Sequence, residues 1–320
     1  MSLNTNFNVN PYYDDFDETK KFLRLLFKPG YAVQARELTQ LQTLLQNQVQ
    51  RQGDFLFKNG SLVTGGQIVN SKAVYINLSP VYATTTIVAN NFVDQTILSI
   101  DESKRAKVLR VYDVDSGTGD PITLMVQQLY GDAFESGESI KTNELSPYLA
   151  NTTGVGEGLL VSVDTGVYYY DGYFIETDKQ TVAVSKYSTS SANARVGYEI
   201  SESIVTSSSD TSLLDPAQDA SNYQAPGADR YKIDLVLSTR GIDSTDDTRF
   251  IQLQEIKESV VTENYQQTQL GVMGDILAQR TYDESGNYTV SPFLVTLEDN
   301  TANEAQTDIV ISPGKAYVQG

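Results

Sequence analysis

A single long helical pattern near the N-terminus constrains this chain more than any other feature. The segment Ala32–Gln52 contains no glycine and no proline. Its apolar residues recur at steps of three and four, as a helix with one apolar face requires: Leu38, Leu41, Leu45 and Val49. We predict a helix of roughly 22 residues from Tyr31, about 33 Å long. Gly53 is the predicted stop, because glycine tolerates the left-handed conformation that ends many helices.

The other faces of this helix are rich in glutamine and carry few charges. The glutamines are Gln34, Gln40, Gln42, Gln46, Gln48, Gln50 and Gln52. Amides can bond to other protein groups without burying a charge, so such faces suit protein contacts on more than one side. One interpretation is an amphipathic helix that covers its own β-sheet. The other is a helix–helix seam between subunits, in which a buried Gln48 fixes the register.

The residues before the helix form a predicted docking arm. Asp17 is a suitable N-cap for a helical turn over Lys20–Phe27, which is strongly apolar. The aromatic side chains of the arm would remain in water unless the arm docks on protein, forgoing about 1.5–3 kcal/mol of burial for each large apolar group. We therefore predict an interface made by the arm and the helix together: Tyr12, Tyr13, Phe16, Phe22, Leu26, Phe27, Leu38, Leu41, Leu45, Gln48 and Val49.

The composition excludes several classes of protein. The chain has no cysteine and no histidine, which excludes disulfides, Ser–His triads, and the usual zinc and haem sites. Its formal charge is −18, which argues against binding nucleic acid or an anionic membrane surface. Apolar runs are only a few residues long, too short to insert through a bilayer. We assign no catalytic residue, no cofactor and no metal, and expect a protein that is not an enzyme.

Carboxylate clusters are the remaining candidates for chemistry. The run Asp14–Glu18 could hold a hard cation, but acidic runs more often pair with Arg and Lys of a neighbour. Asp113–Asp120 resembles a calcium loop superficially, yet it lacks the glutamate at the twelfth position, so we interpret it as a hairpin turn. The close carboxylates at Glu135 and Glu138, and at 243–247, are of the type that glycosidases use, and arise by chance in so acidic a chain.

After the helix the sequence changes to short runs of Val, Ile, Thr and Tyr between turn residues, which predicts strands and hairpins. The predicted strands are Phe55–Phe57, Ser61–Thr64, Lys72–Leu78, Thr84–Ala89, Ala106–Asp113, Thr123–Tyr130, Leu159–Asp164, Gly166–Glu176, Thr181–Lys186, Tyr198–Val205, Tyr231–Ser238, Phe250–Glu255, Tyr288–Leu297 and Ile309–Val318. A second, short helix is predicted over Thr268–Ala278, and a hairpin turn at Asp283–Asn287.

These elements predict an α+β, mainly β fold: an N-terminal arm and long helix followed by several small antiparallel modules, of sandwich or barrel type. We divide the chain into residues 1–58, residues 59–190, and residues 191–320 with a long loop at 207–230. A Gly-x5-Gly frame recurs at Gly60, Gly166 and Gly314, either by chance or as a duplicated β unit. Because the third copy stops at Gly320, we expect the native chain to continue.

Three tyrosines in a row lie inside the second of these frames, at Tyr168, Tyr169 and Tyr170. Side chains alternate across a strand, so the ring of Tyr169 should face away from the other two. Tyrosines on a sheet face can stack on sugars or on another subunit. Packing in a core or an interface is the simpler interpretation.

The N-terminal sequence resembles a known family of viral proteins. The resemblance rests mainly on PYYDDFD at 11–17, LFKPGYAVQARELTQLQ at 26–42 and FKNG at 57–60. It continues through Leu213–Pro216, Pro226–Arg230 and Leu277–Tyr288. These segments are similar to a family of tailed-bacteriophage virion proteins, described as structural, baseplate or tail-fibre components, which carry a domain of unassigned function.

The resemblance implies a virion component that mounts a longer appendage on the phage tail, with other tail proteins as partners, and that is assembled in the host cytoplasm. We expect a homotrimer, because a three-fold axis suits parallel helices and intertwined strands. The alternative function is a receptor- or carbohydrate-binding module of a phage adhesin, with exposed tyrosines as the platform for a host surface glycan.

Overall fold

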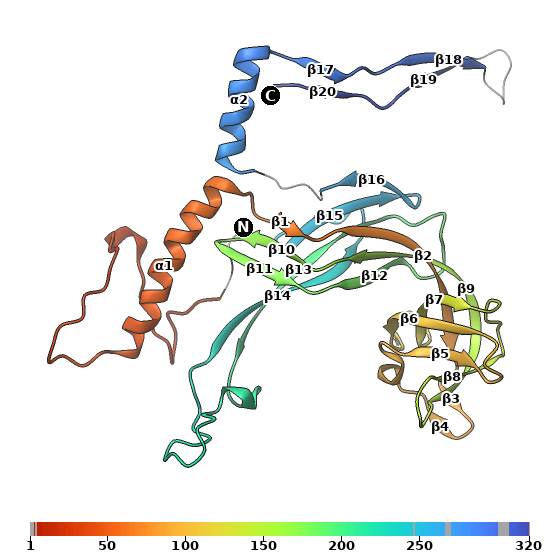
Figure 1. The fold of residues 1–320 in the computed structure, drawn as a ribbon, viewed down its shortest axis with the longest axis horizontal. Coiled ribbons are helices and arrows are strands. Elements are labelled where there is room, and N and C mark those ends of the chain that lie inside the picture. The colour runs from red at the N-terminus through yellow and green to blue at the C-terminus, as the bar shows by residue number, and fades with distance from the viewer. Residues whose placement is uncertain (1–2, 4, 246, 266–269, 300–306, 320) are drawn as a thin grey trace.

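The strands between residues 59 and 264 form three antiparallel sheets and one two-stranded ribbon in the computed structural model, which describes residues 3, 5–245, 247–265, 270–299 and 307–319. Strands make up 44% of the structure and helices 15%, with two α-helices in the part described. The predicted α+β, mainly β fold is therefore confirmed (Figure 1).

Six strands close into a small barrel, with its core inside. In chain order they are β2 (Ile68–Leu78), β5 (Thr96–Ser99), β6 (Arg105–Tyr112), β7 (Thr123–Tyr130), β8 (Ser139–Thr142) and β9 (Leu149–Val163). Around the barrel the order is β9-β2-β7-β6-β5-β8, and β8 pairs back onto β9. Leu124 and Val126 belong to this core, whereas Met125 between them, also fully buried, belongs to a smaller cluster with Ala73 and Leu160, because successive side chains of a strand point to opposite faces.

One end of the barrel is covered by short elements rather than by the predicted strand Thr84–Ala89. The structure has a two-stranded ribbon of β3 (Val81–Tyr82) and β4 (Thr85–Thr86), followed by the 3₁₀ turn η2 (Ala89–Phe92). The prediction was wrong for most of this segment, since Ala89 already begins η2, which places Ala89 and the ring of Phe92 in the barrel core, 5% and 1% exposed. The turn points the Phe92 ring into the core, whereas a strand continuing in the same direction would place it beyond the core.

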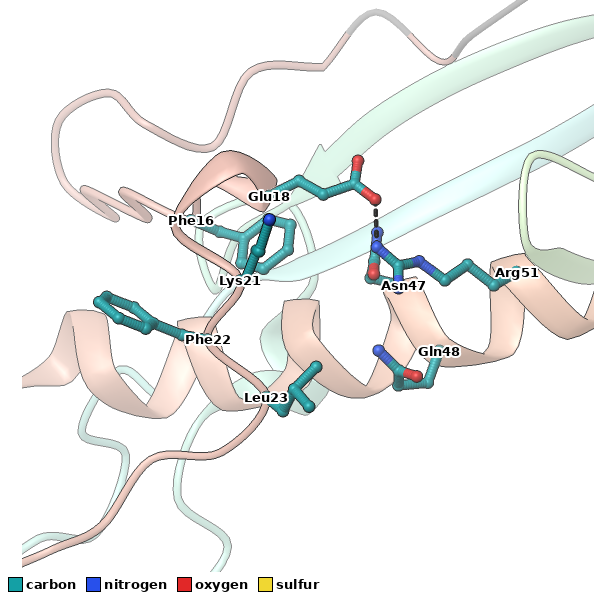
Figure 2. Close-up of a pocket in the computed structure, with 8 residues that line it drawn as sticks. All are labelled: Phe16, Glu18, Lys21, Phe22, Leu23, Asn47, Gln48 and Arg51. Atoms are coloured by element: carbon teal, nitrogen blue, oxygen red, sulfur yellow. Dashed lines mark hydrogen bonds and ion pairs between the residues drawn. The ribbon is translucent and has the colours of Figure 1, made fainter.

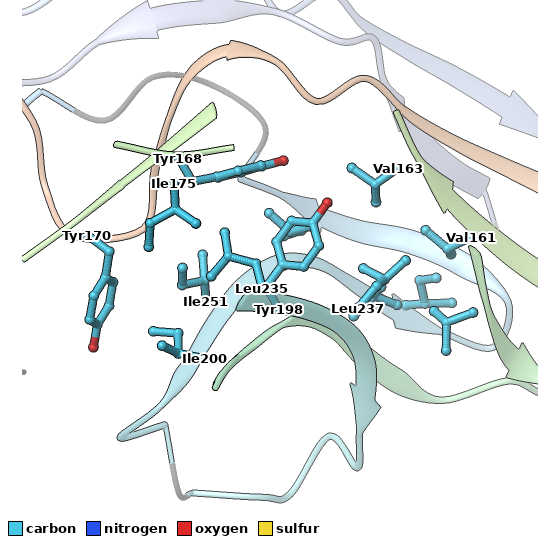
Figure 3. Close-up of a cluster of buried hydrophobic side chains, with 14 of the residues drawn as sticks. Val161, Val163, Tyr168, Tyr170, Ile175, Tyr198, Ile200, Leu235, Leu237 and Ile251 are labelled. Carbon is cyan, nitrogen blue, oxygen red and sulfur yellow. The ribbon is translucent and has the colours of Figure 1, made fainter. Parts of the chain in front are cut away.

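The second core lies beside the barrel, where the last residues of β9 meet two layers of further strands (Figure 3). The elements are β1 (Ser61–Gly65), β10 (Gly166–Tyr170), β11 (Tyr173–Thr177), β12 (Gln180–Ser185), β13 (Ala194–Val205), β14 (Arg230–Arg240), β15 (Phe250–Lys257) and β16 (Val260–Asn264). Val161, Tyr168 and Ile175 pack with Tyr198 and Leu235 in one cluster. The predicted boundary at residue 190 lies in the loop between β12 and β13. Side chains from before and after this loop pack in the same core.

The three consecutive tyrosines divide between two environments. Tyr168 and Tyr170 belong to the second core, where the ring of Tyr168 meets Tyr198 edge-on at 5.1 Å. The ring of Tyr169 packs against Phe57 and Phe174 instead. The predicted alternation is confirmed, and so is packing as the role of these rings, since all three are at most 5% exposed.

Three predicted strands are hairpins or pairs of strands. Gly166–Glu176 turns back at Asp171 and Gly172, which both have positive φ, so β10 pairs with β11. The C-terminal predictions divide likewise, into β17 (Tyr288–Ser291), β18 (Val295–Asp299), β19 (Thr307–Ile311) and β20 (Lys315–Tyr317). β17 pairs with β20 and β18 with β19. Apolar periodicity marked the strands but not where one reverses, as at Gly172, or where the two C-terminal strands are interrupted.

The second helix, α2 (Val272–Ser285), is longer than predicted, and the predicted start at Thr268 lies outside the described residues. The segment predicted as a hairpin turn, Asp283–Asn287, instead contains the end of this helix. Gly286 has a φ of +61° and its N–H donates to the carbonyl of Tyr282. Here the glycine ends a helix, whereas the sequence pattern was read as a turn between strands.

Two other expectations concern local motifs. Residues 113–120 do form the turn between β6 and β7, closed by Asp115 N–H donating to the Asp120 carbonyl at 3.0 Å. The first two Gly-x5-Gly frames lie side by side, because β1 pairs with β10. The third frame contains β20, and its final residue, Gly320, lies outside the described residues.

Candidate functional site

Helix α1 (Ala35–Leu56) has the predicted length of 22 residues but is shifted along the chain. It begins after Gln34, whose backbone N–H donates to the Glu37 carboxylate at 2.9 Å. It continues through Gly53, so the predicted stop there was wrong, as was the strand Phe55–Phe57. Phe57 N–H closes the last turn onto the Gly53 carbonyl at 2.7 Å.

A polar face of α1 packs on the turn of the β10–β11 hairpin. Gln46 donates to the Gly172 carbonyl at 2.5 Å, and Gln50 donates to the Asp171 carboxylate at 2.7 Å. A Cβ on Gly172 would lie 2.6 Å from that of Gln50, so the helix approaches as closely as it does because that residue is a glycine. The helix thus covers its own sheet with amides rather than leucines.

Tyr169 forms the centre of this contact. Its hydroxyl donates to Asp54 at 2.7 Å and lies 3.2 Å from the Gln50 carbonyl. Its ring fills the place a side chain at Gly53 would take, since a Cβ there would be 2.4 Å from the ring. Burial, and then the bond to Asp54, raise the pKa of the Tyr169 hydroxyl, which keeps it protonated as a donor.

The first described part of the arm, residues 3 and 5–12, docks on the body of the protein. Thr5 N–H donates to the Glu202 carboxylate at 2.9 Å, and the Tyr12 hydroxyl donates to Asp229 at 2.6 Å. The bond to Asp229 raises the pKa of the Tyr12 hydroxyl. The arm therefore connects to the start of β14, at the base of the long 207–230 loop (Figure 1).

Asp14 joins the arm to helix α1. It is 5% exposed, and it accepts hydrogen bonds from the Thr43 hydroxyl and, at 3.2 Å, from the Phe16 N–H. Its own N–H donates to the Phe7 carbonyl at 3.0 Å. A buried carboxylate with these donors positions the chain on the helix.

Two other residues of the acidic run pair with cations on the same helix. Asp15 forms an ion pair with Arg36 at 3.0 Å, and Glu18 forms one with Arg51 (Figure 2). All four side chains are about half exposed, so each pair contributes at most about 1 kcal/mol. Throughout the described residues, no group of three or more acidic side chains could hold a metal ion. Asp14, Asp15 and Glu18 therefore hold the arm against helix α1 of the same chain.

Between the arm and α1 runs an open groove of about 440 Å³ (Figure 2). Phe16, Phe22 and Leu23 line it from the arm, and Asn47 and Gln48 line it from the helix. A second groove of about 220 Å³ reaches Leu44, the buried leucine of the helix. The structure thus brings three predicted interface residues, at positions 16, 22 and 48, to one surface.

The apolar stripe of α1, made of Leu38, Leu45 and Val49, faces away from both the arm and the hairpin. These side chains are 52%, 63% and 43% exposed, and Leu41 beside them is half-buried. Gln48 is also exposed. The amphipathicity is therefore largely inverted: apart from Leu44, the helix packs on its own chain mainly with polar groups, and it presents Leu38 and Leu45 to solvent.

Most of the predicted arm residues are exposed. The predicted helix over Lys20–Phe27 does not form. Asp17 does cap a turn, but it is the three-residue η1 (Glu18–Lys20), which Lys21 ends with a φ of +57°. Such a short segment cannot hold a helix without a surface to pack on. The exposed residues are Tyr13 at 55%, Phe22 at 65%, Leu26 at 78% and Phe27 at 49%.

Sequence reasoning missed the residues that hold the helix in place: Asp14, Leu44, Gly53, Tyr169 and Gly172. The glycine inside an otherwise unbroken helix was the available signal, because a helix keeps such a residue where something packs closely against it. It was read as the end of the helix.

The fold and the site define a mainly β protein with an N-terminal docking arm and an outward-facing helix. The chain belongs to the family of a domain of unknown function, DUF4815, whose model matches residues 10–108 and 137–320. Neither a curated protein nor a solved structure matches it. In the described part of the chain, neither α-helix has the length and apolar character needed to cross a membrane.

We expect Asp14→Ala to loosen the arm. Removing this carboxylate leaves the Phe16 N–H without its acceptor and leaves the Thr43 hydroxyl only the Thr39 carbonyl, at 3.4 Å, at a cost of about 1–3 kcal/mol. Hydrogen exchange should become faster in residues 5–18, while barrel amides stay protected. Asp17→Ala is the control, since Asp17 caps an exposed turn. Equal exchange in the arm of both variants would contradict the role of Asp14.

Proposed function

We propose that this protein is a structural component of a bacteriophage tail, in a tail fibre or baseplate, that anchors an appendage through residues 1–58. In this role it belongs to the virion, its partners are other tail proteins, and it carries out no catalysis. The observation that supports the proposal best is the inverted helix α1, which presents Leu38, Leu45 and Val49 to the surroundings of the chain.

The exposed stripe has the properties of a contact between copies. Burying a leucine or valine fully contributes about 1.5–3 kcal/mol, so a partner that covers three recovers several kcal/mol. Leu38 and Leu45 are one heptad apart, with Gln48 beside them. The stripe also carries no charge. In a chain of net charge −18, copies repel one another least through such a surface.

We propose that α1 forms a homotrimer around this stripe. The protein at high concentration should then have three times the mass of one 35.3 kDa chain, measured by light scattering after size-exclusion chromatography. Leu38→Asp with Leu45→Asp should reduce the mass to that of a monomer, because carboxylates buried at a three-fold axis repel one another. A wild-type monomer would contradict the trimer.

A matched control is Val88→Asp with Val93→Asp. These valines beside the barrel are 52% and 46% exposed, close to the exposure of the leucines, and the variant adds the same two charges. It should remain a trimer. Dissociation of both double variants would mean that added charge, rather than the α1 stripe, controls the oligomer.

The location in the particle needs a separate experiment. Cryo-electron microscopy of the phage that carries this chain should show α1 and the arm enclosed by neighbouring tail proteins. Residues 3–58 free of contacts in the assembled tail would refute the anchoring role. The alternative of a glycan-binding module gains no support from Tyr168–Tyr170, since these rings are buried.

A further inference from the structure

The docked part of the arm, residues 5–18, is joined to helix α1 by a segment with little structure of its own (Figure 1). We call this segment, residues 21–34, the linker. All of its residues but one are exposed. Away from its two ends, the described linker backbone makes one hydrogen bond, and that bond is local: the Tyr31 N–H donates to the Lys28 carbonyl at 3.3 Å. The body of the chain therefore does not fix the path of the linker backbone.

The linker is also longer than its path requires. It leads from the turn at Glu18, which pairs with Arg51, back to the start of α1 at Ala35. The helix rises about 24 Å between those two residues of α1. Residues 21–34 can span about 46–50 Å when extended. The excess is larger than the about 8–10 Å between the axes of packed helices, so the docked segment can reach α1 of an adjacent copy.

Every copy of the chain carries the surface on which residues 5–18 dock, formed by α1, β13 and β14. The ring of Phe7 meets Tyr231 edge-on at 4.9 Å, and the Tyr12 hydroxyl donates to Asp229 at 2.6 Å. Asp14 binds to α1. The same surface of a neighbouring copy offers identical partners, so an exchange of arms between copies loses none of these contacts.

The linker has side chains that its own chain leaves uncovered. Phe22, Leu26 and Tyr31 are each at least 65% exposed. The linker carries three cations and none of the 41 acidic residues of the chain. Within the described residues, none of the three forms an ion pair. A second copy of a chain of net charge −18 offers an acidic surface to a basic linker that crosses onto it. The cations are Lys21, Arg24 and Lys28.

We propose that neighbouring copies exchange their arms: residues 5–18 of one copy dock on α1, β13 and β14 of the next, and the linker crosses between them. The proposal rests on the association of copies through the α1 stripe, which brings a neighbour's docking surface close. In that assembly, docking on the same chain loses the advantage of a higher local concentration. Three exchanges close the ring of a trimer. The arm docked on its own chain is then the form of the free monomer.

Because the chain contains no cysteine, two introduced thiols report which copy the arm docks on. We would combine Tyr12→Cys with Asp229→Cys, at a partly buried contact, and bridge the thiols of the full chain with a short bismaleimide. In an exchanged trimer the thiols that meet belong to different chains, so a denaturing gel should show covalent trimer. Asp15→Cys with Gln40→Cys provides a second pair, since these side chains bond at 3.2 Å.

A matched control combines Tyr12→Cys with Thr118→Cys, on the exposed turn between β6 and β7, where the arm does not dock. The contact pairs should give at least ten-fold more covalent trimer than this control. In the Leu38→Asp, Leu45→Asp background they should give only a bridge within one chain, because the arm returns to its own body.

The outcomes separate the exchange from the α1 trimer. A bridge within one chain, in a sample that light scattering shows to be a trimer, would overturn the exchange and leave the trimer intact. The absence of a bridge at both contact pairs would also overturn it, since the arm would then dock on neither copy. A wild-type monomer would refute the α1 trimer, and the exchange with it.

Discussion

Tyr169→Ala should release helix α1 from the β10–β11 hairpin. The ring lies against Gly53, Phe57 and Phe174, and removing a buried aromatic of this size costs about 3–5 kcal/mol. The loss should be local, because this ring lies outside both large hydrophobic clusters. Hydrogen exchange of the α1 amides should increase by two orders of magnitude or more, with barrel amides unchanged.

Tyr169→Phe is the control that separates the ring from the hydroxyl. It keeps the packing but leaves Asp54 without this donor, so about 1–2 kcal/mol should be lost, since a hydrogen bond to a charged group contributes somewhat more than a neutral one. If the two variants exposed α1 equally, the helix would be held by the hydroxyl rather than by the ring.

Gly53→Ala should weaken the same contact, although alanine is the better helix former. In a free helix, replacing glycine by alanine increases helix stability by up to about 1 kcal/mol. Here the new methyl would lie 2.4–2.6 Å from the ring of Tyr169, and overpacking of this kind costs about 1–3 kcal/mol. The clash exceeds the gain in helix propensity. We expect a net loss, seen as faster exchange in α1.

The double variant tests the geometry directly. With Tyr169→Ala the methyl of Gly53→Ala has room, so adding Gly53→Ala to that background should be neutral or slightly stabilising. The two changes would then be strongly non-additive, as expected for residues in contact. Additive losses would show that Gly53 and Tyr169 do not meet.

The contacts of α1 with the β10–β11 hairpin explain why Leu38 and Leu45 are exposed. If helix α1 contacted only the sheet of its own chain, we would expect Leu38 and Leu45 to face that sheet, because this orientation buries the most apolar area. Here Gln46, Gln50 and the glycine at position 53 occupy the sheet side instead. The leucines remain for another molecule, and this supports an assembly role for the helix.

Local rules in the sequence were enough for the elements themselves. The unbroken run before Gly53 specified a helix of the right length, and two-residue alternation specified most strands, Thr123–Tyr130 to the residue. Both predictions depend only on the spacing of residue types along the chain, which the sequence contains. The alternation of Tyr168, Tyr169 and Tyr170 followed for the same reason.

The tertiary structure decided what each element faces. Whether Gly53 ends a helix or admits a ring depends on Tyr169, more than a hundred residues later, and no local pattern contains that contact. The closing of the barrel depends likewise on its first strand, β2, pairing with its last, β9. The inverted face of α1 follows from such distant contacts, because hydrogen bonds to Gly172 and Asp171 outweigh the local pull of the leucines toward a core.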